Sequence, residues 1–132
     1  MKLKFRAWDS TKKEMFKDTF AITESGQVVI VEQESVASSP DYVFVEHLVI
    51  MQSTGLCDKE GTEVFEGDIL HHRIQTEYTF IVKYDKDKGR WYGDGLSRTY
   101  RIDIAKRFLP YYYKVIGNIY ENKNLLEVEN EN

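Results

Sequence analysis

Turn signals divide this chain into short segments, and this division constrains the fold more than any other feature of the sequence. Apolar residues occupy alternate positions over residues 78–84, which is the period of a half-buried strand. Asp-Lys-Asp-Lys-Gly at 85–89 is a turn sequence, and residues 90–93 are predicted to return as the second strand of a hairpin. Segments of this kind recur along the chain, so the sequence predicts about eight short strands.

The rest of the chain follows the same pattern of short strands, and few segments are compatible with a helix. Further strands are predicted at residues 2–8, 15–22, 28–31, 42–45, 69–70 and 111–120. Residues 46–52 form an apolar run without a clean period, and a strand is favoured there over a short helix. Residues 33–41 are small and polar and are predicted to form an exposed loop.

Helix is predicted only in short pieces. Over residues 100–109, Ile102, Ala105 and Leu109 have helical spacing, which predicts a short helix that stops at Pro110. One terminal turn is predicted within residues 122–128. The fold class is therefore mainly β with minor helix, in which short antiparallel strands form a small barrel or two curled, packed sheets.

Length and composition predict one folded domain. The chain has 132 residues, of which 42% are hydrophobic and 14% aromatic, so it can bury enough apolar area to offset its ordering entropy. A single domain is expected over residues 1–128, followed by an acidic tail at 129–132 that frays. Disorder and a large multidomain organisation are both excluded.

The expected compartment is the cytoplasm. Cys57 is the one cysteine, so it cannot form an intramolecular disulfide, and no secretory leader is recognisable. The most apolar stretch, residues 42–51, is interrupted by Glu46 and His47 and is shorter than a membrane-spanning helix requires. No membrane partner is expected.

Charge is distributed unevenly along the chain. The formal net charge is −4, which by itself indicates no partner. By segment, however, residues 1–17 carry +4, residues 18–68 carry −10, residues 69–120 carry +5 and residues 121–132 carry −3. Oppositely charged segments can pair within one chain or between chains.

Three segments carry a resemblance to a known family. They are KLKFRAWD at 2–9, MQSTGLCDKEGTEVFEGDIL at 51–70 and VIGNIYEN at 115–122, together 36 of the 132 residues. In these segments the chain resembles the YopX-like proteins of phages and prophages. The resemblance implies a mainly β fold, a place in the cytoplasm of a bacterial host, and no established activity, cofactor or catalytic residue.

The residues of the segments 51–70 and 115–122 have a structural interpretation. Gly55, Gly61 and Gly67 lie six residues apart at predicted bends, where a glycine tolerates positive φ. Asp68 follows the last of them and is expected to bond nearby backbone amides, and Gly117 lets a strand bend or another backbone approach. A folding role is favoured over an active site for these residues.

Residues with catalytic or metal-binding chemistry do not form a recognisable set. His71 and His72 are adjacent, so on a strand they point to opposite faces and cannot chelate one ion together. Cys57 lies in a turn-rich segment beside an acidic residue and is interpreted as a bystander thiol. The carboxylates of Glu63, Glu66 and Asp68 are interpreted as a solvated rim. The prediction is a non-enzymatic protein without cofactor or metal.

Two kinds of partner remain as hypotheses. The first, which is favoured, is a protein: the chain is expected to be a phage or prophage accessory protein that forms a homo-oligomer or binds a phage or host protein. The alternative is weak binding of single-stranded nucleic acid by the basic, aromatic segment 69–120. The candidate contact residues are Arg90, Trp91, Tyr92, Arg101, Lys106 and Arg107.

Overall fold

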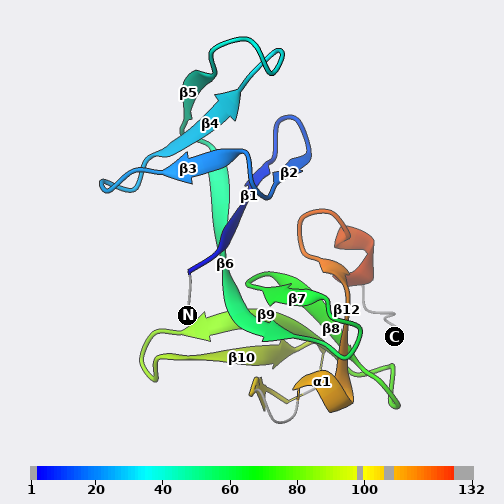
Figure 1. Cartoon of the computed structure of the whole chain (residues 1–132). Helices are drawn as coiled ribbons and strands as arrows, with labels where there is room; N and C mark the ends of the chain where they lie inside the picture. Colours follow the sequence, from blue (N-terminus) through cyan, green and yellow to red (C-terminus); the bar gives the residue numbers. More distant parts are fainter. Residues whose placement is uncertain (1–2, 98–99, 106–108, 127–132) are drawn as a thin grey trace. The chain divides into compact units, whose positions relative to one another are not determined.

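The computed structural model confirms a mainly β fold. It describes residues 3–97, 100–105 and 109–126, and short antiparallel strands dominate this part of the chain (Figure 1). Contacts divide the chain into two compact units: unit 1 comprises residues 1–4 and 51–132, and unit 2 comprises residues 5–50. The expectation of one domain over 1–128 stays a prediction, and the tail at 129–132 lies outside the described residues.

Unit 2 contains a hairpin and a three-stranded sheet. In the hairpin, β1 (Phe5–Asp9) pairs antiparallel with β2 (Glu14–Phe16). The sheet has the strand order β3-β4-β5 and consists of β3 (Phe20–Ile22), β4 (Val28–Glu32) and β5 (Asp41–Val45). Strand β4 is central in this sheet, and its residues Val28, Val29 and Ile30 are buried.

The single strand predicted over residues 15–22 is wrong. Residues 17–19 bend, so the segment is divided into β2 and β3. The reason is that the two halves pair with different strands: Phe16 lies opposite Ala7 of β1, whereas Phe20 lies opposite Ile30 of β4. A local pattern of apolar residues does not show which partner each residue takes.

Unit 1 contains a five-stranded antiparallel sheet in the order β11-β10-β9-β8-β12. Its strands are β8 (Asp68–His72), β9 (Thr79–Asp85), β10 (Arg90–Gly95), β11 (Ile102–Asp103) and β12 (Tyr113–Asn118). Strand β6 (Leu48–Cys57), which begins in unit 2 and continues into unit 1, pairs with β7 (Glu63–Phe65). The strand favoured over a helix at 46–52 is thereby confirmed from Leu48 onward.

The core of unit 1 lies on one face of the five-stranded sheet. Six buried side chains from β7, β8, β9, β11 and the helix form one cluster: Val64, Leu70, Phe80, Val82, Ile102 and Leu109. Trp91 and Tyr113 pack against it while remaining partly exposed. Each fully buried side chain of this size contributes about 1.5–3 kcal/mol to folding, so this cluster stabilises the sheet and defines its inner face.

The helix predicted over residues 100–109 is wrong over residues 100–105, and residues 106–108 lie outside the described residues. Ile102 belongs to β11 and lies opposite Gly93, and a short helix, α1 (Leu109–Tyr112), begins where the predicted one was to stop. Ile102 and Leu109 share an apolar spacing because both enter the same core cluster. Pro110 starts a helix here because the first turn needs no amide donor from it and its fixed φ suits a helix.

Helix is otherwise limited to a single 3-10 turn, η1 (Lys123–Leu126), in the part of the chain that the structure describes. This turn confirms the terminal turn expected there, up to Leu126. No described helix has the length and apolar character that crossing a membrane would require.

Candidate functional site

The basic, aromatic segment divides its side chains between two faces of the sheet. Trp91 packs against the core cluster and meets the ring of Tyr84 edge-on, with 5.0 Å between ring centroids. Tyr92 follows on the same strand and so faces the other side, where the Arg101 guanidinium carbon lies 3.7 Å from its ring centroid. The consecutive aromatic residues therefore do not form one stacking surface.

Two cations of this outer face are already paired with acidic residues. The Arg101 Nη2 lies 2.9 Å from Asp85 Oδ2, and the Lys83 Nζ lies 2.6 Å from Asp94 Oδ2. The hydrogen bond with Asp94 raises the pKa of Lys83. Burial acts to raise the pKa of Asp85, but backbone hydrogen bonds and Arg101 outweigh it, and the pKa is lowered.

Of the remaining candidate contacts, Arg90 alone lies in the part of the chain that the structure describes. Arg90 is exposed and lies opposite Asp85 in the strand register. Lys106 and Arg107 lie outside the described residues. The structure thus brings Tyr92 and Arg101 together, leaves Trp91 on the core side, and pairs Arg101 with a carboxylate.

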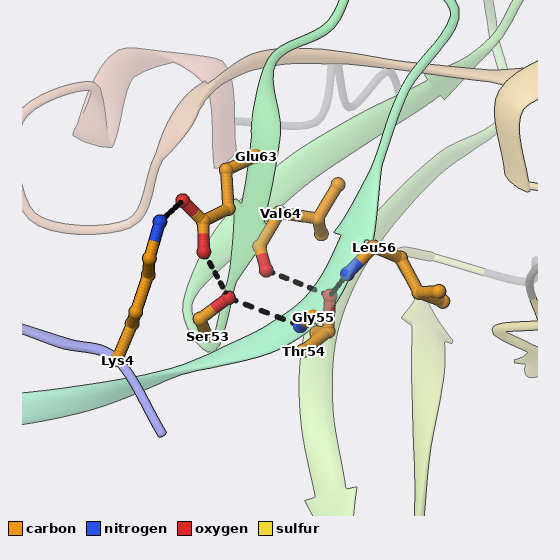
Figure 2. A network of polar contacts seen from close by, with 7 residues as sticks. All are labelled: Lys4, Ser53, Thr54, Gly55, Leu56, Glu63 and Val64. Atoms are coloured by element: carbon orange, nitrogen blue, oxygen red, sulfur yellow. Dashed lines mark hydrogen bonds and ion pairs between the residues drawn. The ribbon is translucent and has the colours of Figure 1, made fainter. Parts of the chain in front are cut away.

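The longest family-like segment builds a polar network between β6 and β7 (Figure 2). The Ser53 hydroxyl donates to Glu63 Oε2 and accepts from the Gly55 amide, and Lys4 Nζ lies 3.5 Å from Glu63 Oε1. The Thr54 hydroxyl donates to the Val64 carbonyl and accepts from the Leu56 amide. These side chains bridge the two strands where their register shifts between Ser53 and Cys57, which is a structural role.

Aspartates in the same segment close the turns. The Asp58 carboxylate accepts from the amides of Glu60 and Thr62 through one oxygen and from the amide of Val115 through the other. Asp68 is buried and accepts from the Phe65 amide at 2.8 Å, so its interpretation as part of a solvated rim is wrong, whereas the expected bond to a nearby backbone amide is confirmed. These contacts leave the carboxylates buried and hydrogen-bonded to backbone, which is the geometry of folding elements.

Glycine is required in the family-like segments either by the backbone conformation or by close packing. Gly55, Gly61 and Gly67 have φ values of 81°, 85° and 86°, in the left-handed region that glycine tolerates. Gly117 instead lies at a register shift of β12, and a Cβ there would come within 2.5 Å of Asn122 Oδ1. One expectation from the sequence was that another backbone approaches Gly117, and the structure places the Asn122 side chain there instead.

The histidines and the cysteine are not assembled into one site. The His72 Nδ1 accepts from the amides of Ile74 and Gln75 and so closes the turn after β8. His71 lies on the opposite face of the strand, where burial lowers its pKa, and Cys57 is exposed. Within the described ranges, no group of three or more His, Cys, Asp or Glu residues could hold a metal ion.

A pocket of about 280 Å³ lies within unit 2, and the sequence analysis did not predict it. Its walls include four apolar side chains, Phe16, Ile30, Val43 and Val45. The titratable residues around it are Asp9, Lys12, Glu14, Glu32 and His47. The pocket is lined both by the β1–β2 hairpin and by the three-stranded sheet. No local pattern in the sequence shows that these two elements come together.

Asp9 organises the hairpin end of the pocket. Its buried carboxylate accepts from the amides of Thr11 and Lys12 and lies 3.0 Å from His47 Nε2. Burial acts to raise the pKa of Asp9, but the two amides and His47 outweigh it and the pKa is lowered. Because Asp9 stays ionised, it holds the imidazole by Nε2–H and fixes the ring beside the pocket.

Strand β5 presents an apolar edge and face. It is a terminal strand of its sheet, and Tyr42, Val43 and Phe44 are 65%, 42% and 63% exposed. The register puts Tyr42 and Phe44 on one face and Val43 on the other, the face that lines the pocket. The sequence predicted this strand, but the unbroken apolar run at residues 42–45 gave no signal for exposure, and the sheet edge was visible only in the structure.

Comparison with known proteins assigns the family. A protein of Enterococcus faecalis, EF1440, has a crystal structure similar to this one, with 30% identity, a TM-score of 0.67, and coverage of 96% of this chain and 99% of that chain. The crystal structure of YopX from Bacillus subtilis has the same fold at 17% identity, with a TM-score of 0.60 and coverage of 96% and 98%. Comparison with curated proteins finds no match. The family model described as YopX protein matches residues 4–127, and the chain therefore belongs to the YopX family.

Proposed function

We propose that this chain is a phage or prophage accessory protein of the bacterial cytoplasm that binds another protein and carries out no catalysis itself. The observation that supports this function best is the terminal strand β5, whose central three residues are apolar and exposed. Terminal strands offer backbone donors and acceptors to an added strand, and exposed apolar edges favour such pairing.

The rest of the sheet favours β5 over β3 as the docking strand. Strand β3 has three residues, whereas β5 has five and pairs with β4 along its whole length. Burying a side chain the size of Tyr42 or Phe44 against a partner contributes about 1.5–3 kcal/mol, and such aromatic residues are enriched at protein interfaces. An extended segment of another protein therefore fits this edge, and a second copy of the chain is the other partner that the test distinguishes.

The test compares two charge insertions on exposed aromatic residues. Phe44→Lys places a charge on β5, and Tyr111→Lys places the same charge on α1, where the side chain is similarly exposed. Light scattering behind gel filtration measures self-association against the monomer mass of 15.6 kDa. Capture from lysate of phage-infected host cells, with each variant as bait, identifies other partners.

The proposal predicts a bound protein, or a dimer, that is present with wild type and with Tyr111→Lys and is lost with Phe44→Lys. Circular dichroism confirms that both variants fold. Binding at β5 would be contradicted if the wild type is a monomer by light scattering and captures the same proteins from lysate as Phe44→Lys does.

Nucleic-acid binding is the second candidate, and the charge pairing of Arg101 and Lys83 counts against it. Its test is titration with single-stranded oligonucleotides at low salt, followed by tryptophan fluorescence, because stacking and counterion release would both contribute there. Quenching that is present with wild type and lost with Tyr92→Ala, a variant that keeps both tryptophans, would support this candidate. Unchanged fluorescence would remove it.

A further inference from the structure

We propose that the unit 2 pocket receives a lysine or arginine side chain from the strand that adds to β5. This inference rests on the proposed function and adds the chemistry of the partner. It assigns the pocket to specificity, while backbone pairing along β5 supplies the general affinity, as in other proteins that bind peptides by adding a strand.

The strand register brings the pocket next to the docking edge. Val43 lies opposite Ile30, and Asp41 lies opposite Glu32, so these four side chains share one face of the sheet. Ile30, Glu32 and Val43 line the pocket. A strand paired with β5 would place every second side chain on this same face, and the residue directly opposite Val43 would have its Cβ about 4.5–5.5 Å from the Val43 Cβ.

The lining favours a side chain with an apolar stem and a cationic end. Phe16, Ile30, Val43 and Val45 supply apolar walls, and the carboxylates of Glu14 and Glu32 stand at the same pocket. Lysine and arginine lay their methylene stems on apolar surface and keep the charged end among polar groups.

Unpaired negative charge at the pocket argues for a cation. Asp41 and Glu32 are directly opposite each other, and like charges in that position destabilise a strand pair. Across the described residues, neither of them nor Glu14 has an ion pair, and the pocket's Asp9 is already bound to His47. Lys12 also lines the pocket, but unit 2 as a whole carries eight acidic against four basic residues.

The size of the pocket fits one side chain. Pockets for whole small-molecule ligands have volumes of about 300–1,000 Å³, and this pocket of about 280 Å³ is slightly below that range. An acidic side chain would be repelled by Glu14 and Glu32, and a fully apolar one would remove water from these carboxylates without pairing them.

The experiment uses three acetylated, amidated peptides of sequence TVTXVTV, in which X is lysine, norleucine or glutamate. Each is titrated into the full chain, and the amide resonances of Val43 and Ile30 are followed by NMR. Norleucine keeps the aliphatic stem of lysine without its charge. We expect the lysine peptide to bind about tenfold more tightly than the norleucine peptide, and the glutamate peptide to bind least.

Two variants separate the pocket from general electrostatics. Glu32→Lys changes the pocket charge and is expected to abolish the preference for lysine. Should this variant not fold, Glu32→Gln replaces it in the experiment and is expected to weaken the preference. Glu24→Lys makes the same charge change in unit 2 at a residue that does not line the pocket, and it is expected to keep the preference.

Each outcome decides between the pocket and the edge. Equal binding of all three peptides at β5 would overturn the pocket's role and leave the edge proposal standing. No shift at β5 with any peptide would overturn both. If n-butylammonium alone shifts the pocket resonances as strongly as the lysine peptide does, the pocket is a site for free amines and the strand-borne role is overturned.

Discussion

At the scale of single residues, short acidic and amide side chains replace backbone partners at the ends of strands. Asp9, Asp58, Asp85 and Asn118 each accept hydrogen bonds from two backbone amides that follow them in the chain. Such turns satisfy amides that no strand can reach. The polar residues of the family-like segments are therefore explained by the folding of the turns.

Asp58→Ala tests this role in unit 1. The substitution leaves the amides of Glu60, Thr62 and Val115 without their acceptor, and we expect it to lower the free energy of unfolding by about 1–3 kcal/mol. Urea denaturation followed by circular dichroism measures it. Asp87→Ala, in the exposed 85–89 turn, is the matched control and is expected to change stability by less than about 0.5 kcal/mol. Equal effects of the two substitutions would contradict the assignment.

His71 predicts a pH dependence of stability. Burial lowers its pKa below the ordinary value of 6.5, so the unfolded chain takes up a proton at a higher pH than the folded chain does. The contribution of this group is present above about pH 6.5 and is lost as the pH falls through the folded pKa. NMR titration of the His71 ring is expected to give a lower midpoint in the folded protein than in urea. A midpoint that is equal or higher when folded would refute it.

At the scale of elements, the pairing partner decides what each segment becomes. Strand β12 is an example, because its register with β8 shifts between Val115 and Gly117, and the Asn122 side chain fills the space beside the glycine. Asn122 Oδ1 also accepts from the Asn118 amide, so the end of the strand and the following turn are held by one side chain.

A double-mutant cycle tests this packing. Gly117→Ala puts a methyl group where Asn122 lies and is expected to destabilise the fold by about 1–3 kcal/mol. In an Asn122→Ala background the same substitution is expected to cost less, because the clashing side chain is gone. Thermal or urea unfolding of the four proteins gives the coupling energy. Strictly additive effects would show that the cost at Gly117 arises elsewhere.

At the scale of the whole molecule, stability is expected to differ between the two units. The main core cluster lies in unit 1, whereas unit 2 has a three-stranded sheet with an exposed terminal strand. Regions with fewer buried apolar contacts open at lower free energy.

Hydrogen exchange measures this difference. Amides of Leu70, Phe80 and Val82 are expected to exchange more slowly than those of β4, and Val82→Ala is expected to speed exchange in unit 1 more than in unit 2. Circular dichroism at the same temperature confirms that the variant remains folded. Uniform protection across β4 and β9, changed equally by the substitution, would contradict two separate units of stability.

The sequence by itself determined the features that depend on neighbouring residues. The 85–89 turn, the strand alternation around Phe80 and the positive φ at Gly61 and Gly67 all follow from local conformational preferences. The family-like segments were likewise readable, because a motif is a local string of residues, and the family model confirms the membership that they indicated.

Only the tertiary structure decided the features that depend on distant partners. Ile102 became a strand residue because Gly93 lies opposite it. Residues 15–22 were divided because one half pairs with β1 and the other half pairs with β4. The pocket in unit 2 and the terminal position of β5 in its sheet arise from the same cause. Strand pairing and burial act between residues far apart in the chain, so the local pattern that predicts a strand does not contain the identity of its neighbour.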